Sequence, residues 1–468
     1  MDHNANHDLE NYNSKRKELL KEAFDMKYEG MTFSDGDLKA NDTFENIRNQ
    51  TLQQLPNRFH FKALDCRDQV ESSELFKILE EMPKGSLQHI HVAFYLPSKW
   101  FVENSLNENI FLDDTGKVGV FKDAPAEPWK SVLKRRSEAT DQKAFDKDLE
   151  NWFHLTDEEM SKPEIWVPFQ RKVGNRLAIC YREGIWKKYI TECCKYAINE
   201  GFSNLQLRTY LPTGYVPTAN FVAKDDEIEL YRECLIEARK VDPNFTIGVI
   251  FTGLRFWPSE KIQNFLEVGR ELKKRHPDVV IGYDFVAEEK LRPALDFAPL
   301  LLEHAKKSEA EGIQLPPIFH GGETLDQNNT NVIDLCLYQS KRIGHGINLF
   351  KHPSLYKRVK ESNICIEVNP LSNQILQYIA DLRLHPAIGY HNFGLKISIS
   401  SDDPGLFQTT TTWDFFAACM SFEFTLLDLK RVILNSIETS CMNKSDIELM
   451  QQDFSNKWDK FVAIITKA

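Results

Sequence analysis

Five side chains have types and positions suited to holding a metal ion: His89, His91, His320, His345 and Asp402. His89 and His91 are separated by a single residue, and in a β-strand residues i and i+2 point to the same face. The pair could therefore bind one ion from a single strand end. Four nitrogen or oxygen ligands suffice to hold one catalytic divalent metal and leave a position for water.

The H-x-H spacing is a weak signal by itself, because it also arises by chance. The later candidates strengthen it, since each lies at or near the end of an apolar run rich in β-branched residues. Such runs cover residues 86–94, 205–210, 246–251, 279–286, 317–320, 342–345, 365–369 and 395–401. Short apolar runs between longer helix-like stretches are typical of βα units with a buried parallel sheet.

Eight such units predict a (β/α)8 barrel, an α/β fold in which the chemistry lies at the carboxyl ends of the strands. The five candidate ligands all fall at or near such ends. The sequence therefore predicts one shared site.

Four regions follow from this pattern. Residues 1–82 contain helix-like stretches and no candidate ligand cluster, and we expect an N-terminal helical region there. Residues 83–96 hold the first barrel strand. Residues 97–165 are charged and break the βα rhythm, which favours an insertion able to cover the barrel mouth. Residues 166–468 complete the barrel.

The segment His320-Gly321-Gly322-Glu323 adds a carboxyl group beside the predicted metal site. Glycines lack Cβ, so the backbone at Gly322 could approach a ligand closely. A carboxyl partly removed from water is a plausible proton shuttle, which is the role we expect for Glu323. The alternative is a glycine turn that carries a surface glutamate.

Adjacent carboxylates at Asp402 and Asp403 repel each other, so burying both requires a cation or strong donors. One could bind metal while its neighbour turns towards substrate. An ordinary Asp-Pro turn is the alternative for this segment.

His345 lies between two glycines, and the alternative interpretation is a core histidine whose ring is hydrogen-bonded to the backbone. Together with three histidine-bearing strand ends, the metal hypothesis is favoured.

The bulk composition excludes several classes of protein. The net charge of −11 comes with no basic stripe, so we expect no nucleic-acid partner. No signal peptide and no run of 18 apolar residues is visible, which predicts a cytoplasmic protein without membrane contact. The nine cysteines include no C-x-x-C pair and are expected to be buried free thiols. Five N-x-S/T sites keep secretion open if the chain begins at a mature N-terminus.

The remaining nine histidines lack comparable context, and no chemical role is expected for them. They are His3, His7, His60, His154, His276, His304, His352, His385 and His391. No Walker loop, no G-x-G-x-x-G after a strand and no G-x-S-x-G elbow is present.

Several motifs resemble those of the adenosine deaminase growth factors, within the superfamily of metal-dependent adenosine and AMP deaminases. Met82 to His91 resembles M-P-K-G-x-L-x-H-x-H, and His320-Gly321-Gly322-Glu323-Thr324 resembles H-A-G-E-T. Residues 342–346 match R-I-G-H-G. Residues 366–374, which read I-E-V-N-P-L-S-N-Q, resemble I-E-V-C-P-I-S-N-Q, residues 381–386 resemble D-L-R-x-H-P and residues 399–404 resemble I-S-S-D-D-P. The resemblance runs from about residue 60 to the C-terminus, with a weaker middle.

This resemblance implies a zinc-dependent purine deaminase with one Zn²⁺ per chain and an N-terminal region that makes a homodimer. His89, His91, His320 and Asp402 would bind zinc. His345 and Asp402 would orient and deprotonate water. Glu323 would protonate N1 of the purine, Asp403 would hydrogen-bond N7, and hydroxide attack at C6 would release ammonia. Substrate contacts are also expected at Trp166, Ala287 and Gly322.

Three departures from the family pattern leave the substrate open. The family usually has Asp at the position of Val92, where it contacts the sugar side of the substrate. Ala287 replaces a family glycine, and its methyl group narrows the pocket. The family's insertion cysteines and signal peptide are absent. The alternatives to adenosine deamination are a hydrolase of the same mechanism with a shifted substrate, and a non-catalytic growth-factor-like protein.

Overall fold

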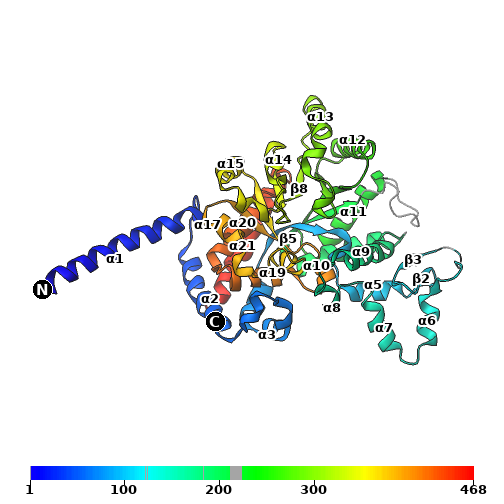
Figure 1. Ribbon diagram of the computed structural model, residues 1–468, viewed down its shortest axis with the longest axis horizontal. Coiled ribbons are helices and arrows are strands. Elements are labelled where there is room, and N and C mark those ends of the chain that lie inside the picture. Colours follow the sequence, from blue (N-terminus) through cyan, green and yellow to red (C-terminus); the bar gives the residue numbers. More distant parts are fainter. Residues whose placement is uncertain (1, 122, 124, 183, 211–223, 468) are drawn as a thin grey trace.

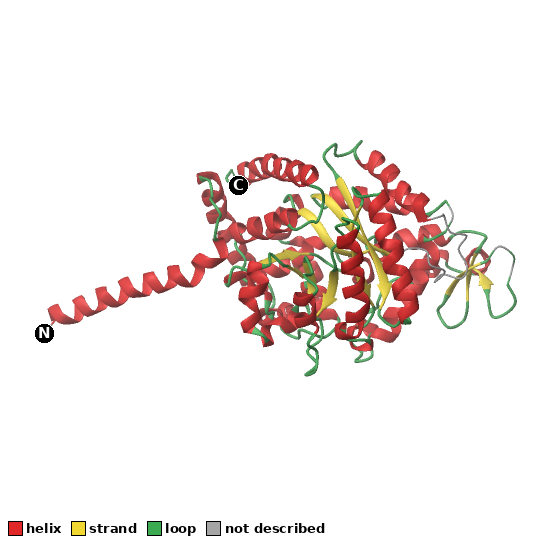
Figure 2. Cartoon of the chain, turned by 90° about the horizontal axis from the view of Figure 1, so that it is seen from above, coloured by secondary structure: helices red, strands yellow, loops and turns green. Residues whose placement is uncertain are grey.

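The computed structural model describes residues 2–121, 123, 125–182, 184–210 and 224–467. Its centre is a parallel sheet closed into a barrel and surrounded by helices (Figures 1 and 2). Within the described residues, eight strands make this sheet: β1 Gly85–His91, β5 Phe202–Tyr210, β6 Thr246–Leu254, β7 Val280–Val286, β8 Ile318–Gly321, β9 Arg342–His345, β10 Cys365–Val368 and β11 Lys396–Ile399. The predicted (β/α)8 barrel is confirmed.

Two four-stranded sheets, ordered β1-β5-β6-β7 and β8-β9-β10-β11, form the barrel wall. Isolated parallel bridges close it, one between Ile90 and Asp402 and one between Tyr283 and Pro317. Asp402 donates its backbone N–H to the His89 carbonyl at 3.0 Å. The closing contact between the first and last strands therefore also brings two candidate metal ligands together.

Each predicted strand is present, although its limits differ by a few residues. The first strand ends at His91, three residues earlier than predicted, because Val92–Phe94 form a 3-10 turn. Gln88 points outward and donates to the Ser436 carbonyl at 2.7 Å, while His89 is fully buried. The alternation expected from strand geometry therefore places both histidines of the H-x-H pair inside.

Helices cover the outside of the barrel and bury its apolar strands. They are α9 Trp166–Cys180, α10 Trp186–Asn199, α11 Lys224–Ala238, α12 Ser259–Arg275, α13 Ala298–Ala310, α14 Asn331–Leu337, α15 Tyr356–Glu361, α17 Ala387–Asn392 and α20 Leu426–Glu438. Shorter helices α16 Pro370–Ile375 and α18 Pro404–Phe407 begin directly after β10 and β11, and α19 Thr411–Ser421 and α21 Lys444–Ile465 complete the C-terminal part. None of the described helices is long and apolar enough to cross a membrane.

Helices also make up the N-terminal region. It contains α1 Asp2–Asp25, α2 Asp35–Gln54, α3 Arg67–Ser72 and α4 Glu74–Glu81. A capping box at Ser34 begins α2, whose apolar face packs on the C-terminal helices. Helix α1 projects away from the body of the protein in both overall views (Figures 1 and 2).

The insertion between β1 and α9 contains a small antiparallel sheet and four helices. Its elements are α5 Ser98–Ser105, β2 Ile110–Leu112, β3 Val118–Val120, β4 Lys130–Ser131, α6 Val132–Glu138, α7 Gln142–Glu150 and α8 Asp157–Met160. The small sheet lies away from the barrel (Figure 1). The returning segment contacts residues that follow β10 and β11: Leu155 donates to the Leu406 carbonyl at 2.9 Å, and Gln377 donates to the Lys162 carbonyl at 2.8 Å.

Candidate active site

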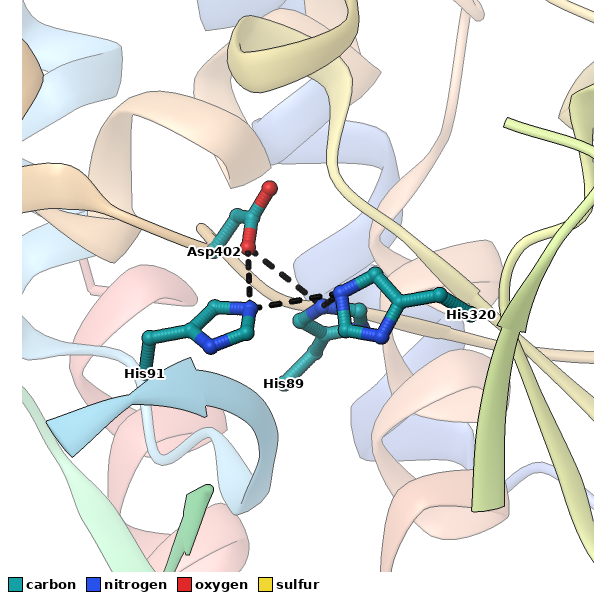
Figure 3. A group of neighbouring side chains, drawn as sticks. All are labelled: His89, His91, His320 and Asp402. Carbon is teal, nitrogen blue, oxygen red and sulfur yellow. Dashed lines mark hydrogen bonds and ion pairs between the residues drawn. The ribbon is translucent and has the colours of Figure 1, made fainter. Parts of the chain in front are cut away.

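Four of the predicted residues converge on one point at the carboxyl ends of the strands (Figure 3). The Nε2 atom of His320 lies 3.1 Å from Nε2 of His89 and 3.2 Å from Nε2 of His91. The Oδ1 atom of Asp402 lies 3.2 Å from His91 Nε2 and 3.4 Å from His89 Nε2. All four side chains are buried. The sequence prediction of a shared cluster is confirmed, while binding of an ion by it stays a prediction.

The outward nitrogens show that this cluster fits a cation. Nδ1 of His89 lies 2.8 Å from Glu367 Oε2, and Nδ1 of His320 lies 2.7 Å from Asp284 Oδ2. An ionised carboxylate only accepts, so each Nδ1 donates and leaves a lone pair on Nε2. Two lone pairs at 3.1 Å repel, so the two rings require a shared proton or metal ion. Carboxylate–histidine pairs of this kind typically orient metal ligands.

The carboxylates of the cluster favour positive charge at its centre. Burial and Arg208 would lower the pKa of His89, but Asp402 and Glu367 raise it. Burial would likewise raise the pKa of Asp402, yet His89 and His91 hold it well below its usual range. Burial lowers the pKa of His91 and lowers that of His320 to about 4, so these rings offer lone pairs that a divalent ion at the same point would bind together with the Asp402 carboxylate.

Two buried arginines hold the supporting carboxylates. Arg208 donates from Nε to Asp284 Oδ2 at 2.8 Å and from Nη2 to Glu367 Oε2 at 2.7 Å. Arg342 donates from Nε to Glu367 Oε1 at 2.6 Å. Burial would raise the pKa of Glu367, but Arg208 and Arg342 hold it well below its usual value. Both carboxylates are therefore ionised acceptors that fix the histidine rings.

His345 and Glu323 lie beside the cluster rather than in it. Nε2 of His345 is 3.5 Å from Glu323 Oε1 and 3.9 Å from Asp402 Oδ2. His345 has a φ of 65°, a left-handed conformation that non-glycine residues adopt at a cost of about 1–2 kcal/mol. This left-handed conformation at the last residue of β9 places the His345 side chain beside the cluster.

The surroundings of Glu323 and Asp403 favour the protonated form of both carboxyl groups. Burial raises the pKa of Glu323 well above its usual value, and the charges of Asp402 and Glu289 raise it further. Burial, Asp402 and Glu323 do the same to the pKa of Asp403. Both groups can therefore donate a hydrogen bond or a proton near neutral pH.

Glu289 anchors the loop that carries Glu323, and sequence reasoning missed it. Its carboxylate accepts from the backbone N–H of Gly322 at 2.6 Å and of Thr324 at 3.1 Å, on both sides of Glu323. The side-chain amides of Asn329 and Asn331 donate to it at 2.8 and 2.6 Å. The position of Glu289 after β7 gave no local signal, because its four partners lie more than thirty residues away along the chain.

The three remaining predicted substrate residues lie around this centre. Trp166 begins α9, is half-buried and donates from Nε1 to Tyr378 Oη at 3.2 Å. Ala287 follows β7 with a φ of 90°, a conformation that favours glycine. The N–H of Gly322 donates to Glu289, so it is not available for a direct hydrogen bond to a substrate. Contacts of these residues with a substrate stay predictions.

A family model described as adenosine deaminase matches residues 142–453. The chain belongs to the adenosine deaminase family. An adenosine deaminase of Phlebotomus duboscqi is 30% identical over 450 residues, which cover 91% of this chain and 85% of that protein. Adenosine deaminase 2-A of Danio rerio is also 30% identical and covers 87% of this chain and 85% of its own. The resemblance to the adenosine deaminase growth factors is thereby confirmed.

Solved structures with the same fold are more distant in sequence. A cog1816 amidohydrolase from Burkhoderia ambifaria with bound zinc has a TM-score of 0.61 at 17% identity, covering 84% of this chain and 95% of its own. An arabidopsis N6-mAMP deaminase has a TM-score of 0.59 at 15% identity, covering 81% of this chain and 99% of its own. At these identities the likeness shows the shared barrel fold.

Proposed function

We propose that this protein is a zinc-dependent aminohydrolase that converts adenosine, or a closely related 6-aminopurine nucleoside, to the 6-oxo product and ammonia. One observation carries the proposal. A cluster of three imidazole nitrogens and one carboxylate oxygen, with ligand atoms within 4.8 Å of one another, lies beside the buried carboxyl of Glu323, whose pKa is raised by burial. Family membership makes the reaction class an enzymatic deamination rather than a non-catalytic role.

The donor set is three histidines and one carboxylate, which suits zinc, and such sites hold a further position for water. A bound zinc ion supplies Lewis acidity that lowers the pKa of water towards neutrality. The zinc named with the Burkhoderia ambifaria structure supports this choice of metal. The three histidines and Asp402 are the residues that would hold the ion.

Four side chains of the protein carry out the remaining steps of the reaction. Glu323 donates its proton to N1 of the purine ring, which makes C6 electrophilic. Asp403 donates a hydrogen bond to N7 and fixes the base. His345 and Asp402 orient the water that attacks C6. Water adds to C6 as N1 takes up the Glu323 proton, and the new C–O bond forms with loss of one water proton to Asp402. The C–N bond then breaks, and the amino group leaves as ammonia with that proton. The remaining hydroxyl proton returns to Glu323, which leaves the 6-oxo product protonated at N1.

The test is ammonia release from adenosine, 2′-deoxyadenosine, 5′-methylthioadenosine, AMP, adenine and guanosine, each with and without a chelator. We expect chelator-sensitive turnover of adenosine or 2′-deoxyadenosine. If zinc-loaded, folded protein released no ammonia from any of these purines, the proposal would be contradicted. Turnover that a chelator leaves unchanged would contradict the role of the metal.

The second candidate function is the same reaction on a substrate other than adenosine. The residues at two positions favour it. Val92 stands where the family pattern described in the sequence analysis has an aspartate. It is 1% exposed, and its carbonyl accepts from Tyr189 Oη at 2.6 Å. Ala287 brings a methyl group to a backbone position with φ 90°. Removing a carboxylate could admit a less polar or an anionic 5′ group, because a repulsive charge is gone. A Val92→Asp variant should then improve turnover of adenosine relative to AMP, and an unchanged ratio would contradict this candidate.

A homodimer made through the N-terminal region is also proposed. Helix α1 carries four exposed apolar side chains at helical spacing: Leu9, Tyr12, Leu19 and Leu20. An unburied apolar stripe on a projecting helix is typical of an association surface. Light scattering should give twice the chain mass for the full chain and the monomer mass after Leu19→Glu. A monomeric full chain would contradict the proposal.

A further inference from the structure

Three consecutive side chains on α16 contact three different parts of the protein. Ser372 donates from Oγ to Asp402 Oδ2 at 2.8 Å. The side-chain amide of Asn373 lies 3.0 Å from His345 Nδ1. Gln374 donates to the His60 carbonyl in the N-terminal region at 2.9 Å. The motif Ser372-Asn373-Gln374 thus binds two site residues, and the function described above uses neither contact.

A backbone amide fixes the direction of the hydrogen bonds that reach Asn373. The N–H of Ala387 can only donate, and it donates to His385 Nδ1 at 3.1 Å. Burial lowers the pKa of His385 to about 3, so its ring is neutral and carries its one proton on Nε2. That Nε2–H donates to Asn373 Oδ1 at 3.0 Å. His385, for which the sequence predicted no chemical role, therefore orients the Asn373 amide.

The orientation of this amide decides the tautomer of His345. With Oδ1 bound to His385, the NH2 group of Asn373 faces His345 and donates to its Nδ1. The amide nitrogen of Asn369 lies 3.4 Å from the same atom. A nitrogen that accepts carries no hydrogen, so the neutral ring bears its proton on Nε2. Nε2 is the atom that faces Glu323 and Asp402.

We propose that Asn373, held by His385, is a positioning residue that fixes His345 as a hydrogen-bond donor towards the reacting centre. The nitrogen that faces the site has no free lone pair, so His345 orients the attacking water through its N–H and does not take the proton of that water. This sharpens the shared role given above to His345 and Asp402. The chemical consequence rests on the proposed function, whereas the tautomer itself does not.

The tautomer can be read directly by long-range ¹H–¹⁵N correlation spectra of zinc-loaded protein labelled with ¹⁵N-histidine. The spectrum of a His345→Gln variant assigns the His345 signals by difference. We expect a protonated Nε2 and an unprotonated Nδ1. A proton on Nδ1, or on both nitrogens, would overturn the proposal. This readout does not depend on turnover, so its failure is distinct from a failure to deaminate adenosine.

Variants of Asn373 and His385 test whether the tautomer of His345 affects the rate of the reaction. In Asn373→Asp the new carboxylate accepts from Nδ1–H, which moves the ring proton away from the site. We expect kcat to fall by at least about 100-fold, with KM within about threefold and zinc content unchanged. His385→Gln, which keeps an N–H donor, should retain more activity than His385→Leu. Wild-type kcat in Asn373→Asp would overturn the proposal.

The matched control is Gln374→Ala, one residue further along α16. This change removes the hydrogen bonds between the Gln374 side-chain amide and the backbone of His60 and Ala63 in the N-terminal region. It leaves the contact between Asn373 and His345 intact. We expect wild-type kcat and an unchanged His345 spectrum, together with lower thermal stability. Should Asn373→Asp fail to fold, the wild-type spectrum still decides the tautomer.

Discussion

The metal side and the substrate side of the site differ in what would complete the polar atoms that face its centre. On the metal side these atoms are the histidine Nε2 atoms and Asp402 Oδ1, which has no hydrogen-bond partner among the described residues, and they face one point suited to a cation. On the metal side, the outward nitrogens of His89 and His320 each bind a buried carboxylate, and Arg208 holds both carboxylates. On the substrate side, His345 Nε2 and Asp403 Oδ1 are buried and have no hydrogen-bond partner among the described residues.

This difference separates two tasks at the same strand ends. The metal side is organised in advance, so the geometry of its ligands does not depend on substrate. A buried polar atom without a partner costs about 1–3 kcal/mol, and a substrate or water that satisfies it recovers that free energy. The substrate side is therefore arranged so that the binding of a polar base completes it.

The largest effect on activity is expected when a ligand is removed from the metal side. We expect Asp402→Ala to reduce deamination by at least about 1,000-fold and to lower the zinc content below one per chain, because one ligand and one water-orienting oxygen are lost together. Metal analysis and ammonia release measure both effects. Asp326→Asn, in an exposed loop, should leave both unchanged. Normal turnover by Asp402→Ala would disprove the site.

Removing the proton donor tests the substrate side alone. Glu323→Gln keeps the shape of the side chain but cannot deliver a proton to the ring. We expect turnover to fall by at least about 100-fold while one zinc per chain is retained. A rate equal to that of the wild type would rule out the acid role of Glu323.

A smaller loss is expected when the anchor of the Glu323 loop is weakened. In Glu289→Gln one acceptor oxygen becomes an NH2 group facing N–H donors of the loop and of Asn329. We expect turnover to fall by about 10–100-fold with zinc content unchanged, as for other residues that hold reacting groups in place. An equal loss of zinc would instead assign Glu289 to the metal side.

The pH dependence of stability distinguishes the two sides in metal-free protein. The folded-state pKa of Glu323 is raised by burial and by Asp402, so the stability that its proton confers is present below its unfolded pKa and lost as pH rises through the folded value. Glutamine does not titrate. The stability of Glu323→Gln relative to wild type should therefore grow with pH, by more than about 1 kcal/mol between pH 5 and 8 in urea unfolding. A pH-independent difference would contradict the protonated state of Glu323.

The smallest effect is expected at Ala287, whose φ of 90° strains a residue with a Cβ. Ala287→Gly should stabilise the protein by up to about 1 kcal/mol in urea unfolding, because glycine adopts this conformation without strain. Loss of stability would show that the methyl group packs favourably enough to offset the strain.

The metal ligands could be predicted from sequence because strand alternation and strand ends determine where they point. His89 and His91 share a strand face, and His320 and Asp402 follow or end apolar runs, so barrel closure brings them together. Arg208 and Glu367 lie in predicted strands and Asn373 lies in a recognised motif, but nothing in the sequence identified the partners of these three residues. Their roles depend on which atom of a distant ring they meet, and that contact exists only after the barrel has formed.

The same limit explains the errors at the borders of elements. The first strand ends at His91 because Val92–Phe94 turn, and no residue type in that run marks the change. His385 was not expected to contribute, since its link to the site runs through Asn373 rather than through its own neighbours in the sequence.

Stepwise addition of zinc to metal-free protein, with ammonia release from adenosine measured after each addition, tests the central claim most directly. We expect activity to rise in proportion to zinc and to stop rising at one equivalent per chain, because four ligand atoms converge on a single point. Full activity without zinc, or a continued rise to two equivalents, would contradict this account.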